Sequence, residues 1–142
     1  MIGKDPQEAF AAFVRCVEQA TAGVRFSRLD ERTFQGQLAQ CLEDAGMKPV
    51  REFKLACAGD DVEAVLSIVG DRVDFYFFDG GFALECKMDR SVSAHLRQCK
   101  RYAEHDCVNG VLLCAMATVP RSLPEELGGK PFGYLNFALK CL

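Results

Sequence analysis

The sequence predicts an α/β protein with a central mixed β-sheet flanked by helices, and three observations favour this class. Within the segment 72–87, runs of aromatic and β-branched residues lie on both sides of Gly80-Gly81, a strong short-range signal of a β-hairpin. Two other segments, within 10–22 and 30–45, repeat apolar residues at helical spacing. A continuous apolar run at 110–116, GVLLCAM, is typical of a central strand covered on both faces.

Composition limits the alternatives to one ordinary globular domain spanning residues 1–142. The chain is 49% hydrophobic and 26% charged, and no apolar run approaches the length of a membrane span. Its first ten residues lack the basic start and apolar core of a signal peptide, so we expect a cytoplasmic protein. None of the eight cysteines forms a Cys-x-x-Cys pair, which favours buried reduced thiols over a zinc ribbon or an iron–sulfur cluster.

The first two helices are predicted with their ends. Asp5 is the expected N-cap of a helix reaching about residue 22, with Glu8 completing a capping box. A second helix is expected over 30–45, where Gly46 supplies the C-terminal stop.

The remaining elements follow in chain order. We expect a strand over 48–57, where apolar residues lie among charges, whereas 62–69 fits a helix and a strand about equally. A third helix is expected over 91–105, capped by the segment Ser91-Val92-Ser93. After the apolar strand, a short helix is predicted at 124–127 and a last strand at 134–139.

The hairpin carries three charges, and its register decides whether they meet. If Gly80-Gly81 is a two-residue turn, Asp74 lies opposite Lys87, and Glu85 emerges on the same face as both. A loop with an odd number of residues would turn Asp74 to the other face. Because a buried charge is costly unless it is paired or binds a metal, this cluster requires an explanation.

Two carboxylates beside an ammonium suit a hard cation such as Mg²⁺, which takes oxygen ligands and often a substrate phosphate. The pattern of Asp74 on one strand and Glu85-Cys86-Lys87 on the next resembles the signature of the PD-(D/E)XK nuclease superfamily. Val73 stands where the family name has proline, which removes no ligand. The resemblance covers about residues 33–114 and implies a restriction-endonuclease-like core.

The resemblance also implies a metal site and roles for its residues. Asp74, Glu85 and the backbone carbonyl of Cys86 would hold Mg²⁺, for which Mn²⁺ can substitute. The cation would polarise the phosphoryl oxygen and lower the pKa of a bound water. Lys87 would orient that water and offset charge at the phosphorus.

A fourth ligand is open. Many superfamily members carry a helix glutamate aimed at the metal, and its usual place falls here on Gln35. Either the ligand is absent, or Glu31, one turn earlier, serves from a shifted register. An ordinary first-turn acid, favoured by the helix dipole, explains Glu31 equally well.

The third expected helix adds a second match. Gln98 and Tyr102 are four residues apart and so share a face, and their spacing resembles a motif of RecB-like exonucleases. That resemblance implies that Gln98 contacts the phosphate or Lys87 and that Tyr102 contacts nucleic acid. The same helix carries positive charges at positions that would join Tyr102 in a nucleic-acid surface; these are Arg97, Lys100 and Arg101.

These features favour a metal-dependent nuclease acting on nucleic acid, with DNA as the favoured substrate. The alternative is a nuclease fold that has lost activity and binds nucleic acid or a protein partner, which Gln35 and the net charge of −3 would allow. Substrate form, exonuclease against endonuclease cleavage, and a homodimer are left open. No membrane association is expected.

Overall fold

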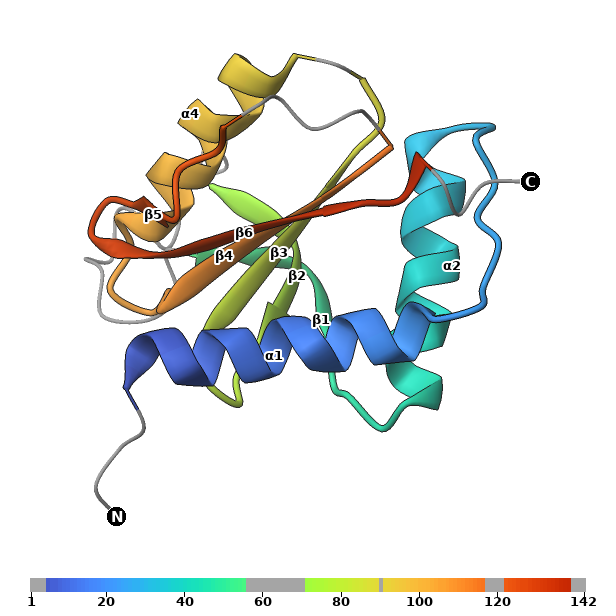
Figure 1. Ribbon diagram of the computed structural model, residues 1–142, viewed down its shortest axis with the longest axis horizontal. Helices are drawn as coiled ribbons and strands as arrows, with labels where there is room; N and C mark the ends of the chain where they lie inside the picture. Colours follow the sequence, from blue (N-terminus) through green and yellow to red (C-terminus); the bar gives the residue numbers. More distant parts are fainter. Residues whose placement is uncertain (1–4, 56–70, 90, 117–121, 139–142) are drawn as a thin grey trace.

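The computed structural model describes residues 5–55, 71–89, 91–116 and 122–138. Over these ranges the chain forms a six-stranded mixed sheet and three α-helices (Figure 1). The elements, in chain order, are α1 (Pro6–Thr21), α2 (Glu31–Asp44), β1 (Val50–Lys54), β2 (Arg72–Phe77), β3 (Phe82–Lys87), α4 (Val92–Ala103), β4 (Gly110–Ala115), β5 (Glu126–Leu127) and β6 (Lys130–Asn136). The predicted α/β class with a mixed central sheet is therefore confirmed.

The sheet has the strand order β1-β2-β3-β4-β6-β5. Strands β1, β2 and β3 are antiparallel neighbours, β3, β4 and β6 run parallel, and β5 is antiparallel to β6. Helix α4 connects the parallel strands β3 and β4 and lies on one face, while α1 and α2 lie on the other (Figure 1). No helix within the described ranges has both the length and the apolar character needed to cross a membrane.

Each face of the sheet has its own apolar core, and β4 contributes to both. Leu112 and Cys114 belong to the core under α1 and α2, whereas Val111 and Leu113 belong to the core under α4. All six residues of β4 are buried. The apolar run at 110–116 is thus a central strand, as its composition predicted.

The three predicted helices are confirmed, and Gly46 follows the end of α2 as predicted, but the predicted N-caps of α1 and α4 do not form. The side chain of Asp30 accepts a hydrogen bond of 2.7 Å from the backbone N–H of Thr33 at the start of α2. Asp5 and Ser91 occupy N-cap positions, but neither side chain makes a capping hydrogen bond. The predicted capping box of α1 is therefore wrong, and Pro6 in the first turn remains as its start signal.

The hairpin forms with a longer loop than predicted. Phe77 pairs with Phe82, so four residues, 78–81, connect the strands, and the backbone N–H of Gly81 donates to the carbonyl of Phe77 at 3.0 Å. The register is shifted by two residues, which places Asp74 next to Glu85 in place of Lys87. Since the loop length is still even, the three charged side chains keep their common face.

The other strand predictions have mixed outcomes. β1 lies inside the predicted 48–57, while 62–69 falls outside the described residues. The helix predicted at 124–127 is wrong, because Glu126–Leu127 forms a short edge strand on β6. β6 itself begins at Lys130, four residues before the predicted start.

Substitution of Gly81 tests whether the hairpin loop requires a glycine at this position. Its φ of +72° lies in the left-handed region, and an added Cβ would come within 2.9 Å of the carbonyl oxygen of Cys107. We expect Gly81→Ala to lower the free energy of unfolding by about 2–3 kcal/mol in a denaturant titration. The matched control is Gly23→Ala, with φ +75° and no atom within 4 Å of the added methyl. It should cost about 1 kcal/mol, and equal losses would contradict the steric part of this argument.

Candidate active site

The two hairpin carboxylates lie where the pairing of β2 with β3 ends. The paired register stops at Phe75 and Leu84, and beyond it the carboxylates accept the backbone N–H groups of the opposite strand. Glu85 Oε1 accepts from the N–H of Asp74 at 3.1 Å. Asp74 Oδ2 accepts from the N–H of Cys86 at 2.8 Å. Each acid therefore fixes the other strand, and the two side chains are brought together by reciprocal hydrogen bonds.

Lys87 completes the predicted cluster. Its Nζ lies 3.4 Å from Glu85 Oε2, and its side chain is 20% exposed, against 4% for that of Glu85. The acid is therefore buried, while the ammonium lies between it and solvent. A buried carboxylate with one cationic partner is only partly compensated for its loss of hydration.

Two residues of α4 hold the second oxygen of Glu85. Tyr102 Oη lies 3.1 Å from Glu85 Oε2 and 3.2 Å from the carbonyl oxygen of Arg72. Gln98 Nε2 donates to Tyr102 Oη at 2.6 Å. The predicted common face of Gln98 and Tyr102 is confirmed.

Tyr102 lies in the core and not on the surface where its contact with nucleic acid was expected. Its side chain is buried, with 1% of its surface exposed, because the ring packs in the core between α4 and the sheet. Sequence reasoning missed this because a tyrosine on an amphipathic helix can lie on either side of the boundary between core and surface. The apolar ring of Tyr102 packs in the core, while its terminal hydroxyl can hydrogen-bond to a buried carboxylate.

Burial and proximity shift the pKa values of both acids upward. Desolvation raises the pKa of Glu85 from 4.5 to about 8, and the nearby negative charge of Asp74 adds to this effect. The pKa of Asp74 rises from 3.8 to about 6, again chiefly through desolvation, although its hydrogen bond from Cys86 opposes the shift. Two adjacent acids that resist ionisation together form a site in which added positive charge is strongly favoured.

The pKa of Lys87 is also raised, although for a lysine desolvation opposes the shift. Desolvation lowers the pKa of Lys87, but the negative charges of Glu85 and Glu31 outweigh it and leave that pKa above its ordinary value. Lys87 is therefore an ammonium at neutral pH, able to attract an anion but not to act as a base.

Glu31 and Gln35, the two candidates for a fourth ligand, differ in their electrostatic effect on the cluster. The charge of Glu31, at the first turn of α2, raises the pKa values of Asp74 and Lys87, so this acid lies within electrostatic range of the cluster. Gln35 lines a groove together with Glu31 and contributes no charge. Glu31 is thus the acid that α2 presents toward the cluster.

Glu52 is a neighbour that the sequence did not single out. It lies on β1, its charge raises the pKa of Asp74, and its φ of +53° is the one positive value among non-glycine residues of the described part. Its only signal in the sequence is a charge within an expected strand, which is common on a solvated edge.

The basic residues of α4 lie on the exposed side of the helix. Arg97, Lys100 and Arg101 are all exposed. Arg101 Nε also pairs with Asp71 Oδ1 at 3.3 Å, so part of its charge is neutralised. The predicted basic surface therefore exists, with Arg97 and Lys100 as its unpaired members among the described residues.

The carboxylates of the cluster could bind a divalent cation only if water or a substrate supplied the remaining ligands. Over the described ranges, no three or more histidine, cysteine, aspartate or glutamate side chains have the arrangement of a metal centre. Asp74 and Glu85 offer two carboxylates whose ionisation is disfavoured by burial and mutual repulsion. A cation relieves that repulsion, and Mg²⁺ usually keeps several waters and phosphate oxygens as ligands, so the donor chemistry fits.

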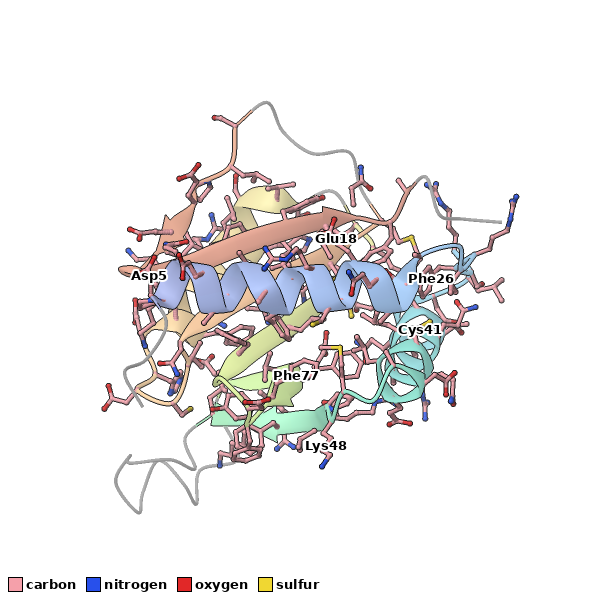
Figure 2. All side chains as sticks on the ribbon, turned by 60° about the horizontal axis from the view of Figure 1, so that its bottom comes forward. Asp5, Glu18, Phe26, Cys41, Lys48 and Phe77 are labelled. Atoms are coloured by element: carbon pink, nitrogen blue, oxygen red, sulfur yellow. The ribbon has the colours of Figure 1, made fainter. Side chains whose placement is uncertain are left out.

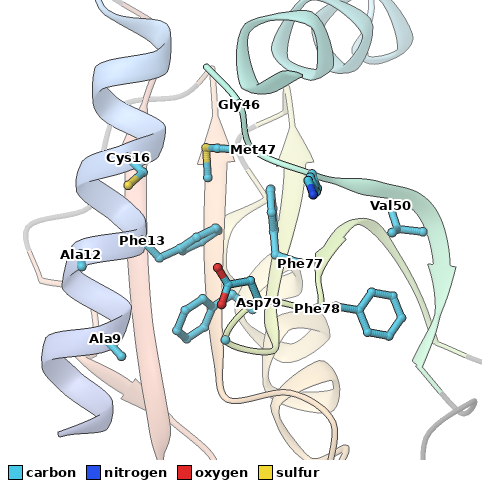
Figure 3. Close-up of a pocket in the computed structure, with 13 residues that line it drawn as sticks. Ala9, Ala12, Phe13, Cys16, Gly46, Met47, Val50, Phe77, Phe78 and Asp79 are labelled. Carbon is cyan, nitrogen blue, oxygen red and sulfur yellow. The ribbon is translucent and has the colours of Figure 1, made fainter. Parts of the chain in front are cut away.

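A separate apolar hollow lies at the far end of the hairpin (Figure 3). Phe13 of α1, Met47, and Phe77 and Phe78 of the hairpin line it, and none of the three clustered charges does. This hollow is distinct from the candidate active site, and its apolar lining does not suit an ionic substrate.

Comparisons with known proteins do not assign the chain to a group. No family model matches it, and searches of curated proteins and of solved structures found no match either.

Proposed function

We propose that the chain is a metal-dependent nuclease with a restriction-endonuclease-like core, hydrolysing phosphodiester bonds, with DNA as the favoured substrate. The observation that carries the proposal is the reciprocal pairing of Asp74 and Glu85 at the end of the β2–β3 ladder, with the Lys87 ammonium 3.4 Å from Glu85. An ordinary surface ion-pair cluster would not bury two acids beside each other at the cost that their raised pKa values imply.

The arrangement of elements supports the same proposal. Helix α2 precedes the three antiparallel strands β1, β2 and β3, and helix α4 then leads to β4, which is parallel to β3. Asp74 lies on the second strand and Glu85 and Lys87 on the third, with α4 packed over them. This is the order that the resemblance to PD-(D/E)XK nucleases leads us to expect.

Each residue has a role in this proposal. Asp74, Glu85 and the carbonyl of Cys86 would hold Mg²⁺, or Mn²⁺ as a substitute, with Glu31 as a further acid within range. When bound, the cation supplies Lewis-acid polarisation of a phosphoryl oxygen and activation of a water. Lys87 attracts the phosphate and offsets the charge that develops at phosphorus.

Gln98 acts through its neighbour and not on the phosphate. By donating to Tyr102 Oη it fixes the hydroxyl that contacts Glu85 Oε2, so both are positioning residues for the carboxylate. This role differs from the contact with the phosphate or Lys87 that the family resemblance implied for Gln98.

The test is a cleavage panel of linear, circular, single-stranded and four-way-junction DNA with Mg²⁺ and with Mn²⁺. We expect cleavage of at least one substrate that requires the cation and stops on addition of EDTA. Circular DNA separates endonuclease from exonuclease action, because an exonuclease needs an end. Cleavage that persists in EDTA, or no cleavage of any substrate, would count against the proposal.

The basic surface of α4 gives a separate prediction. Arg97→Ala with Lys100→Ala should weaken binding of duplex DNA and lower the slope of log affinity against log salt by about 2, one unit for each lost phosphate contact. Fluorescence anisotropy over a salt series measures both quantities. Because Arg101 is already paired with Asp71, Arg101→Ala should have a smaller effect and serves as the comparison. An unchanged slope in the double variant would show that these residues are ordinary solvated surface charges that do not contact phosphates.

A second candidate function is that of an inactive binding module. It is favoured because the two acids already have hydrogen-bond and ion-pair partners within the protein. Asp74 and Glu85 already accept backbone N–H groups, and Glu85 is also contacted by Tyr102 and Lys87. Such a network can hold the splayed strands together without a cation. Binding of DNA without cutting under any metal condition would select this function.

A further inference from the structure

A polar groove lies at the β1 edge of the sheet, beside the first turn of α2. β1 is the outermost strand of the described sheet, so its outer edge carries no neighbouring strand there. The residues that line the groove are Glu31, Arg32, Gln35, Arg51 and Glu52.

The groove adjoins the candidate active site along the sheet. The pairing of Arg51 with Phe75 and of Phe53 with Val73 places Glu52 opposite Asp74. Two of the lining residues, Glu31 and Glu52, are acids, and the two arginines are the groups of the groove that can bind a phosphate.

Both arginines are available to a ligand. Arg32 and Arg51 are exposed, and neither has an ion pair within 4 Å among the described residues. The guanidinium carbon of Arg51 lies 5.7 Å from the centre of the Phe75 ring, which restricts the side chain before any ligand arrives. A planar, pre-oriented guanidinium suits the paired oxygens of a phosphate.

The backbone of β1 is distorted at the point that aims Arg51 into the groove. Successive odd positions of a strand should share a face, yet Arg51 lies over Phe75 while Phe53 stacks on Tyr76, which belongs to the opposite core. Glu52, which lies between them, has a left-handed φ of +53°. Such strained conformations persist mostly where the surrounding structure requires them, often at functional sites.

We infer that this groove binds the sugar-phosphate backbone of the substrate beside the scissile phosphate, with Arg32 and Arg51 each contacting a neighbouring phosphate. The inference rests on the proposed function, whose substrate it extends beyond the reacting bond. Contacts of the two arginines with phosphates would position the strand and carry no sequence information.

The test compares two double variants of equal charge. Arg32→Gln/Arg51→Gln alters the groove, and Arg15→Gln/Arg25→Gln alters two exposed arginines that do not line it. Affinities for a single-stranded and a duplex 20-mer are measured by anisotropy over a salt series with Mg²⁺, in a Glu85→Gln background so that the DNA survives. We expect the groove pair to weaken binding about tenfold or more and to lower the duplex salt slope by about 2. The control pair should change affinity less than about threefold.

Further readouts separate the possible failures. In the active protein, the groove pair should raise KM with little change in kcat, because it removes binding that ground state and transition state share. Arg32→Lys/Arg51→Lys should restore the salt slope but not the full affinity. Lysine keeps the positive charge but lacks the paired N–H donors with which a guanidinium binds two phosphate oxygens. If the parent binds and cuts DNA and the groove pair behaves as the control pair does, the inference is wrong while the proposed function stands. If the parent neither binds nor cuts DNA, both are overturned.

Discussion

Glu85→Gln abolishes cleavage while leaving DNA binding equal to, or slightly tighter than, that of the parent; this is the largest effect that the site leads us to expect. The substitution keeps the size of the side chain but removes one of the two charges that would hold the cation. Loss of one positioned group at a hydrolytic site typically costs on the order of 10²-fold or more in rate. It also removes a negative charge that repels the phosphate. Initial rates in Mg²⁺ and anisotropy of a labelled duplex measure the two quantities.

The control is Glu18→Gln, the same chemical change on the exposed side of α1 (Figure 2). It should cut DNA at the parental rate. Lys87→Ala should also lose cleavage but retain stabilisation by Mg²⁺, because an ammonium is not a metal ligand. A Glu85→Gln protein that cuts as fast as the parent would show that the acids form only a structural cluster.

Without divalent cations, the free energy of unfolding should fall as the pH rises from about 4 to about 8, through these two acids. Their pKa values are raised in the folded protein, to about 6 for Asp74 and about 8 for Glu85, so the folded state holds more protons than the unfolded state across this window. The stability that the protons provide is lost as they leave. At pH 8, Glu85→Gln should therefore be more stable than the metal-free parent, by on the order of 2 kcal/mol, or about 5 °C or more in Tm.

Divalent cations should reverse that difference. Mg²⁺ or Mn²⁺ binds the ionised acids, so it should raise the Tm of the parent at pH 8 and have little effect at pH 5, where protons compete. The stability gap between parent and Glu85→Gln should close as cation is added. Thermal scans at both pH values, with EDTA and with each cation, provide the measurement. If the Tm of the parent does not change with pH or with added cation in this window, the two acids do not have the raised pKa values and the cation affinity expected here.

Periodicity and turn chemistry were enough to predict most of the elements. The helical repeats that became α1 and α2 were clear, α4 was predicted from the segment at its start, and the uninterrupted apolar run correctly indicated a strand buried on both faces. Parity also placed Asp74 with Glu85 and Lys87, because any even loop gives the same face. These features depend on local patterns that a sequence displays directly.

The errors arose where tertiary contacts decide between local alternatives. The turn was predicted from its two glycines, but Phe78 is 66% exposed and joins the loop with Asp79, so β2 ends at Phe77 while β3 still begins at Phe82. Likewise, 126–127 pairs with β6 in place of forming a helix, because a neighbouring strand edge was available. The burial of Tyr102 and the left-handed Glu52 depend on long-range packing that no local pattern encodes.

The single hydroxyl proton of Tyr102 faces two acceptors, Glu85 Oε2 and the carbonyl oxygen of Arg72, and can satisfy only one of them fully. An ionised Glu85 attracts that proton, whereas a protonated or cation-bound Glu85 releases it toward Arg72. The phenol ring is therefore an optical reporter of what occupies the acids. With three tyrosines and no tryptophan in the chain, its ultraviolet difference spectrum is not obscured by indole absorption.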